Sequence, residues 1–220
     1  MAKSAILTAT GAGFAIPTGM ILGLLCALKR NSLFDHAVSA ITIFAAAMPE
    51  FVTGGLFIVI FSTGLGWLPP FASAAPNKSL PQAAAELVLP VAALSLVILA
   101  YILRMMRAST IDVLDSEYVK AAILKGLSRR RIILSHVLPI AMGPTLAVVA
   151  LSIGWMAGGL IIVESLFGYP GIGRLLVFAI QNRDMPLLQA ITLIIATVYA
   201  LANLGADMIN RGLDPRVAAR

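Results

Sequence analysis

Residues 117–139 read EYVKAAILKGLSRRRIILSHVLP, and they differ in character from the chain on either side. The flanking sequence is apolar, whereas this stretch combines helix-forming residues with a basic run and a glycine. Asp115 or Ser116 can cap a first helix, Gly126 can take the left-handed position that ends it, and Ser128 can cap a second helix. The stretch therefore predicts two short helices joined by a glycine turn, set between long apolar segments.

The rest of the chain has the composition of a membrane protein. Of the 220 residues, 60% are hydrophobic and 12% are charged, whereas a soluble domain carries about 25% charged residues. About 20 predominantly apolar residues are needed to cross the hydrocarbon core of a bilayer. Five segments meet this requirement and predict an all-α, polytopic membrane protein with about five transmembrane helices: 4–28, 37–63, 87–106, 140–163 and 186–208.

The basic residues predict the orientation of these spans. If the five spans alternate in direction, 12 of the 16 Lys and Arg residues fall on one side of the membrane, and Lys3, Lys78, Arg174 and Arg183 fall on the other. The richer side is expected to be cytoplasmic. This places the N-terminus outside, the C-terminus inside, and residues 107–139 in a cytoplasmic loop. The net charge of +6 thus reflects membrane topology and does not indicate nucleic-acid binding.

The first predicted helix of the opening stretch has two interpretations. Tyr118, Ala121, Ala122 and Lys125 follow a spacing of three and four residues, which predicts one flat face of small side chains. Such a face suits docking into a groove of a soluble partner. Alternatively, the basic run 129–131 could bind anionic lipid headgroups. A lipid-binding helix should carry a bulky apolar stripe, so the spacing favours docking.

The two longer external connections differ in character. Residues 67–86 are rich in Pro, Ala and Ser and are expected to form an irregular loop. Residues 164–185 begin with several glycines and Pro170, and then LLVFAI at 175–180 predicts a short amphipathic helix. This second connection could cover the outer end of the helical bundle or take part in gating, and the sequence leaves both open.

Glu50 is the one formal charge deep within an expected span, and it follows Pro49. An unpaired carboxylate is costly to bury in lipid, so it should face the bundle interior or an aqueous cavity. It is a candidate for lining a translocation pathway. The alternatives are a carboxylate satisfied by backbone groups freed near Pro49, or one close to a shifted span boundary.

The sequence carries no pattern of an enzyme. His36 and His136 have no Cys, Asp or Glu at ligand spacing, so no metal site is predicted. The motifs G-x-x-x-x-G-K-[ST], G-x-S-x-G and H-E-x-x-H do not occur. No catalytic residue and no cofactor in this chain are therefore expected.

The opening stretch resembles the EAA loop of ABC importer permeases, whose pattern is E-A-A-x-x-x-G, nine residues, and then I-x-L-P. The chain matches it with Ala121, Ala122, Gly126, Leu138 and Pro139, and it departs with Lys120 in place of Glu and His136 in place of Ile. Further likeness comes from EYV at 117–119, KGL at 125–127, VESLFGYPGIGRLL, NRDMPLLQ and the tail LDPR at 213–216. These resemble the B-type permeases of the dipeptide/oligopeptide/nickel branch.

The resemblance implies that residues 1–220 form the transmembrane domain of a type I importer, without the additional N-terminal span of B-type permeases. It implies a docking role for Glu117, Tyr118, Ala121, Ala122, Lys125, Gly126, Leu138 and Pro139. The expected partners are a C-type permease subunit, cytoplasmic ABC ATPases that bind ATP and Mg, an extracytoplasmic substrate-binding protein, and the lipid bilayer of a bacterial or archaeal inner membrane. The expected substrates are peptides, or nickel and other small solutes.

The alternative function is a secondary transporter or channel subunit without ATPase coupling. Such proteins often contain inverted or parallel repeats with broken helices at corresponding positions, and no repeat is visible in the sequence. The ABC importer permease is therefore the preferred hypothesis.

Overall fold

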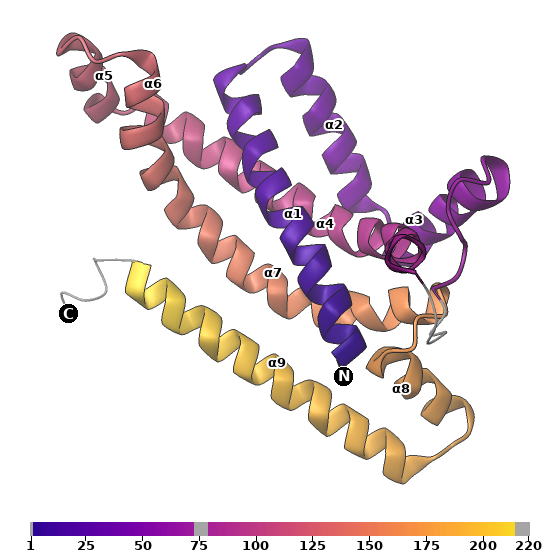
Figure 1. Cartoon of the computed structure of the whole chain (residues 1–220). Coiled ribbons are helices and arrows are strands. Elements are labelled where there is room, and N and C mark those ends of the chain that lie inside the picture. The colour runs from indigo at the N-terminus through magenta and orange to yellow at the C-terminus, as the bar shows by residue number, and fades with distance from the viewer. Residues whose placement is uncertain (1, 73–78, 214–220) are drawn as a thin grey trace.

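The computed structural model describes residues 2–72 and 79–213, and within these ranges the chain is helical without a strand (Figure 1). The tail motif at 213–216 thus falls almost wholly outside the described residues. The elements follow in the order α1 (Ala2–Leu28), α2 (Leu33–Ala47), α3 (Glu50–Phe57), the π-helical turn η1 (Ile58–Gly64), α4 (Leu80–Leu114), α5 (Glu117–Leu124), α6 (Arg129–Ile132), the π-helical turn η2 (Ile133–Val137), α7 (Leu138–Leu166), α8 (Ile172–Gln181) and α9 (Met185–Leu213).

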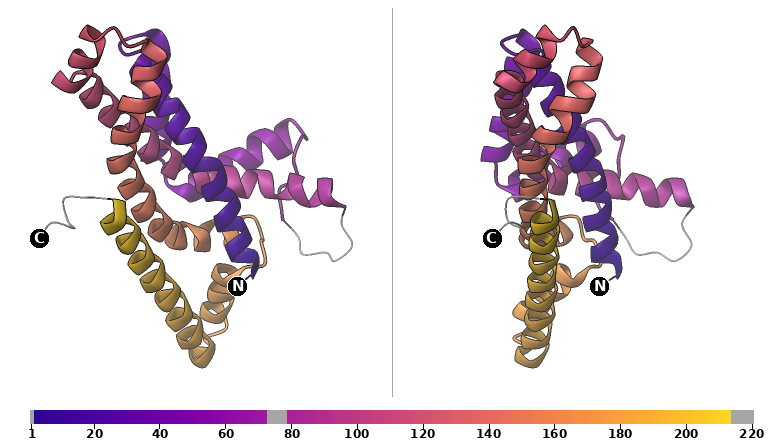
Figure 2. Two further views of the ribbon diagram at one scale, coloured as in Figure 1. Left: turned by 60° about the vertical axis from the view of Figure 1, so that its left-hand side comes forward. Right: turned by 90° about the vertical axis from the view of Figure 1, so that its left-hand side faces the viewer.

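Among the residues that the structure describes, four helices are long and apolar enough to cross a membrane, and the bent pair of α2 with α3–η1 makes up to five. The expected all-α, polytopic fold is therefore confirmed. α4 lies at the centre, with α1 and α7 packed against it, and α9 follows α7 along one side of the molecule (Figures 1 and 2).

Small residues allow α1 to approach α4 closely. A Cβ atom at Gly23 would lie 2.6 Å from the carbonyl oxygen of Leu103 and 2.8 Å from the Cβ of Met106. Near the other end of α1, the hydroxyl of Ser95 donates a hydrogen bond of 3.1 Å to the carbonyl of Gly11. Close backbone approach at small residues is a common way for membrane helices to pack, and here it aligns α1 and α4.

The second expected span, 37–63, is not one straight helix. The chain bends by 110° between α2 and α3–η1. Met48 has an extended backbone with φ −83° and ψ 133°, because the ring of Pro49 disfavours the helical conformation for the residue before it. The segment is apolar and helical as predicted, but the sequence did not predict that it bends.

The boundaries of α4 also differ from expectation. The helix begins at Leu80, so the prediction of an irregular loop up to residue 86 is wrong from there onward. Ser79 and Gln82 form a capping box, in which the Gln82 side chain accepts a 3.3 Å hydrogen bond from the Ser79 backbone N–H. At its other end α4 continues to Leu114, into the predicted cytoplasmic loop.

Candidate functional site

The segment between α4 and α7 forms the two helices that its sequence predicts. The Ser116 hydroxyl accepts a 3.4 Å hydrogen bond from the Val119 N–H and caps α5. Gly126 has φ +77° and ends the helix in the left-handed conformation. Ser128 stands at the N-cap of α6 but makes no side-chain cap bond there. The second helix is continuous with the next long helix, because α6 passes through η2 directly into α7.

A small apolar core holds this segment together. Its buried members are Val119, Ala122, Ile132 and Val137. The prediction that Ala122 shares a docking face with its neighbours is therefore wrong: Ala122 is buried, whereas Tyr118, Ala121 and Lys125 are exposed. Ala122 lies at the edge of the predicted face next to Val119, and α5 is rotated so that this edge meets α6.

The surface left by this rotation carries exposed apolar side chains. Leu124 is 89% exposed and Ile123 is 59% exposed. Large apolar groups on the surface of a helix outside the expected membrane spans mark an interaction site when they lie together. The outer face of α5, defined by Tyr118, Ala121, Leu124 and Lys125, is the candidate docking face, and its most exposed member, Leu124, was missed by the sequence reasoning.

Tyr118 and His136 join the two halves of the segment. The Tyr118 hydroxyl and Nδ1 of His136 lie 2.7 Å apart, and the rings meet edge to face with centroids 5.4 Å apart. Glu117 makes an ion pair with Lys120, at 2.8 Å, on the exposed side of α5. Leu138 is half-buried and Pro139 is exposed where η2 passes into α7.

The ion pair of Asp35 with Arg107, here called the ionic bracket, holds α4 near the end from which the segment projects. The guanidinium of Arg107 donates from Nε to Asp35 Oδ1 at 2.6 Å and from Nη2 to Asp35 Oδ2 at 2.7 Å. Asp35 is 1% exposed. Arg30 forms a second, exposed bond of 2.7 Å to Asp115. Arg107 therefore ties α2 to α4.

Glu50 lies at the first position of α3, immediately after the bend. Its side chain is half-buried and reaches α7, where a Cβ atom at Gly159 would overlap the carboxylate. Among the described residues no hydrogen bond or ion pair reaches this carboxylate. Backbone groups freed near Pro49 thus do not satisfy it, since the Pro49 carbonyl instead accepts from the N–H groups of Val52 and Thr53.

Glu164 is a second carboxylate inside the bundle, and the sequence reasoning missed it because it stood at an expected span boundary. The residue is completely buried in α7. Its Oε2 accepts hydrogen bonds from the backbone N–H of Gly173, at 2.7 Å, and of Arg174, at 3.3 Å. Oε1 has no partner among the described residues. The carboxylate thus occupies the N-terminus of α8, where the helix dipole favours negative charge.

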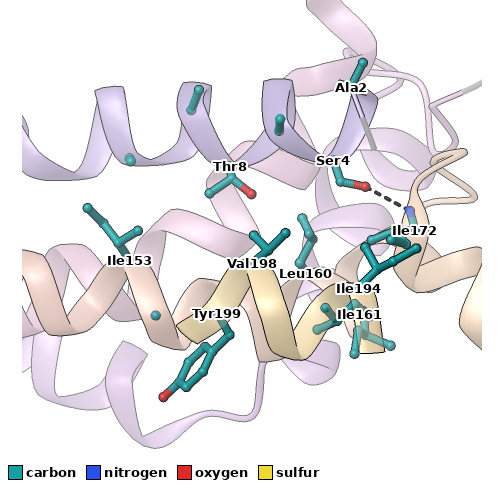
Figure 3. Close-up of a pocket in the computed structure, with 15 residues that line it drawn as sticks. Ala2, Ser4, Thr8, Ile153, Leu160, Ile161, Ile172, Ile194, Val198 and Tyr199 are labelled. Atoms are coloured by element: carbon teal, nitrogen blue, oxygen red, sulfur yellow. Dashed lines mark hydrogen bonds between the residues drawn. The ribbon is translucent and has the colours of Figure 1, made fainter. Parts of the chain in front are cut away.

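Two glycines make room for this arrangement. A Cβ at Gly171 would overlap the Glu164 carboxylate, and one at Gly173 would lie 2.5 Å from the Cα of Ile161. The same turn is also held to the start of α1, because the Tyr169 hydroxyl donates to the Lys3 carbonyl at 3.0 Å. The Ile172 N–H donates to the Ser4 hydroxyl at 2.8 Å, as Figure 3 shows. The glycine spacing in ESLFGYPGIGR was the available signal for this contact.

Residues 19–219 match the family described as "Binding-protein-dependent transport system inner membrane component". The chain belongs to this family. It is therefore a transport permease subunit, and the sequence-based resemblance to ABC importer permeases is confirmed. Because the family consists of inner-membrane components, the expected membrane location is also confirmed, apart from the orientation of the termini.

Curated members of this permease family are similar along most of the chain. The di/tripeptide transport system permease protein of Pseudomonas aeruginosa (strain UCBPP-PA14) is 34% identical over 93% of this chain and 67% of its own length. The glutathione transport system permease protein of Escherichia coli (strain K12) is 34% identical over 96% of this chain and 66% of its own length. The chain spans about two thirds of the length of these relatives.

Solved structures share the fold. The inward-facing MetNI methionine ABC transporter matches with a TM-score of 0.73 at 16% identity, over 96% of this chain and 93% of that chain. An amino acid ABC transporter crystallised with histidines matches with a TM-score of 0.65 at 20% identity, over 96% of this chain and 91% of that chain. The permease thus has the transmembrane fold of ABC importers.

Proposed function

We propose that this permease subunit works in an ATP-driven importer and docks a separate cytoplasmic ATPase through the outer face of α5. The observation that carries the proposal is the cluster of Tyr118, Ala121 and Leu124, which is exposed although it sits on a segment with its own buried core. Apolar surface of this kind gains free energy when a partner covers it, at about 25 cal/mol per Å² removed from water.

The proposed mechanism follows from how the segment is connected. α6 and η2 continue into α7, and Asp115 and Ser116 link α4 directly to α5. A movement imposed on the segment by a closing ATPase is therefore passed to both α4 and α7. The ATPase can supply coupling free energy only if it binds the segment differently in its two states.

The remaining partners and the substrate are part of the same proposal. The partners are a C-type permease subunit, an ATPase carrying ATP and Mg, and an extracytoplasmic binding protein. The segment from α5 to η2, here called the docking segment, lies on the cytoplasmic side. The peptide and glutathione substrates in the names of the relatives support a peptide-like solute. Glu50, which is half-buried beside Gly159 and has no hydrogen-bond or ion-pair partner among the described residues, is proposed to line the pathway.

Substitution of Ala121 tests the docking proposal. Ala121→Asp places a charge on an exposed position of the face, so it should leave the fold of the segment intact and abolish co-purification with the ATPase. Ala121→Ser keeps the side chain small and is the matched control, for which normal co-purification is expected. If the ATPase still co-purified with the Asp variant and transport were normal, the docking assignment would be wrong, and a transporter without ATPase coupling would become the better hypothesis.

A further inference from the structure

A groove runs between α1 and α9 on the half of the molecule that contains α8. Its deeper part has a volume of about 590 Å³ and is lined mainly by small and aliphatic side chains of α1, α7 and α9, including Ala5, Ala9, Ile153 and Val198. Figure 3 shows the α1 side chains on one wall, with Val198 and Tyr199 of α9 opposite. A volume of this size lies in the range of about 300–1,000 Å³ that holds small ligands.

A second hollow of about 620 Å³ continues the groove toward the start of α9. The two hollows share Ile172 and Ile194, and the second is lined by Arg174 of α8. The Arg174 guanidinium has five N–H donors, and its one side-chain hydrogen bond among the described residues is the 2.6 Å bond to the Gly168 carbonyl. The outer part of the groove thus contains a guanidinium cation whose other N–H donors are available to a ligand.

The length of the groove corresponds to one leaflet of a bilayer. Along α9 its lining extends from Leu187 in the outer hollow to Tyr199 in the inner one. This is about 18 Å at a rise of 1.5 Å per residue, and half of the hydrocarbon core is about 15 Å. A transmembrane helix of a partner would run the full thickness and is 10–12 Å wide, so it fits this groove poorly.

We infer that the groove binds a phospholipid of the leaflet in which α8 lies, with an acyl chain between α1 and α9 and the phosphate at Arg174. The acyl chain would cover exposed apolar surface of α9, because only 6% of the apolar part of this helix is buried within the described residues. The anionic phosphate complements the Arg174 guanidinium, which can bind it with two parallel hydrogen bonds.

Photo-crosslinking tests this inference on the full chain, purified with its associated subunits and reconstituted in bilayers. The probe is phosphatidylglycerol with a photoactivatable group in one acyl chain, and cross-linked peptides are identified by mass spectrometry. Cross-links are expected on the groove residues of α1 and α9. Ala9→Phe fills the groove and should lower their yield about tenfold. Gly13→Phe, at a position that does not line the groove and where an added Cβ would meet nothing within 4 Å, should leave the yield unchanged.

The headgroup contact has its own test. Arg174→Gln should weaken lipid retention about tenfold in native mass spectrometry, as expected for a lost charge-assisted hydrogen bond, and Arg183→Gln is the control. Ala5→Phe repeats the groove-filling test in case Ala9→Phe does not fold. Cross-links spread evenly over the lipid-facing surface, or an absence of cross-links from the groove residues of α1 and α9, would overturn the inference.

Discussion

Two carboxylates inside the helical bundle, Glu50 and Glu164, have opposite surroundings. Glu164 is completely buried and receives two backbone N–H groups at the start of α8, so its position is fixed. Glu50 is half-buried, lies beside a glycine of α7 and has no partner among the described residues. A carboxylate held by backbone donors serves the structure, and one that remains unpaired within a membrane domain is a candidate for function.

Glu50→Gln tests the pathway role. The substitution keeps the size of the side chain and removes its charge, so the subunit should assemble normally while uptake of the substrate changes. Uptake into proteoliposomes containing the assembled transporter measures the effect, and the amount of co-purified partner subunits is the control. Unchanged uptake would remove Glu50 from the pathway.

Gly171→Ala should destabilise the turn before α8. The added Cβ would displace the Glu164 carboxylate and leave the Gly173 N–H unpaired, at a cost of about 1–3 kcal/mol. Thermal unfolding of the detergent-purified protein measures this as a lower Tm. Gly158→Ala, on α7 where a Cβ meets nothing within 4 Å, should leave Tm unchanged or raise it. Equal effects of the two substitutions would contradict the structural role of Glu164.

The docking segment, which runs from α5 to η2, is held together by contacts within it and attached through the end of α4. Its apolar core joins α5 to α6 and η2, Tyr118 meets His136, and the bracket of Asp35 and Arg107 anchors the end of α4 from which the segment projects. A loop held in this way moves as a unit with α4 and α7. In the proposed mechanism, the bracket therefore affects how well movement of the ATPase is transmitted, although it makes no contact with the docking face.

Arg107→Ala should destabilise the contact between α2 and α4. It leaves the buried Asp35 carboxylate without its ionic partner, which costs about 3 kcal/mol or more. Arg104→Ala on the same helix is the control, because Arg104 is exposed and stacks on Tyr101, a contact of about 0.5–1 kcal/mol. Thermal unfolding and the rate of limited proteolysis between residues 112 and 139 are measured for both variants. The double substitution Asp35→Ala with Arg107→Ala should recover part of the loss, and an additive loss would argue against the ion pair.

The sequence predicted the apolar segments and the two helices of the docking segment because hydropathy and capping are local properties. It did not predict the 110° bend at Met48 and Pro49, since an apolar window contains no information on direction. It also placed Ala122 on the exposed face of α5, whereas the residue is buried. Whether a residue at the edge of a helical face is exposed depends on the neighbouring helix, which the local sequence does not determine. Glu164 was missed for a similar reason: its donors come from a helix that folds back onto α7.

At the scale of the whole molecule, the two ends of the bundle are built differently. At one end, two ion pairs tie the end of α4 to Arg30 and to α2, and a small apolar core joins α5 to α6, η2 and the end of α4. At the other end, the Glu164 contact and the bonds to Lys3 and Ser4 hold α8 against α1. α1, α4 and α7 join these ends through closely packed apolar surfaces. Such a body is suited to transmit movement as a unit, which is what the proposed coupling requires.

Site-specific cross-linking between Leu124 and the ATPase tests the central claim most directly. Cys26 is buried and is the one cysteine of the chain, so Leu124→Cys in a Cys26→Ser background gives a single reactive thiol on the docking face. The proposed docking predicts a cross-link from this thiol to the ATPase in the assembled transporter, with a yield that changes when ATP is added. A thiol that remains freely reactive in the assembled transporter and forms no cross-link to the ATPase would contradict it.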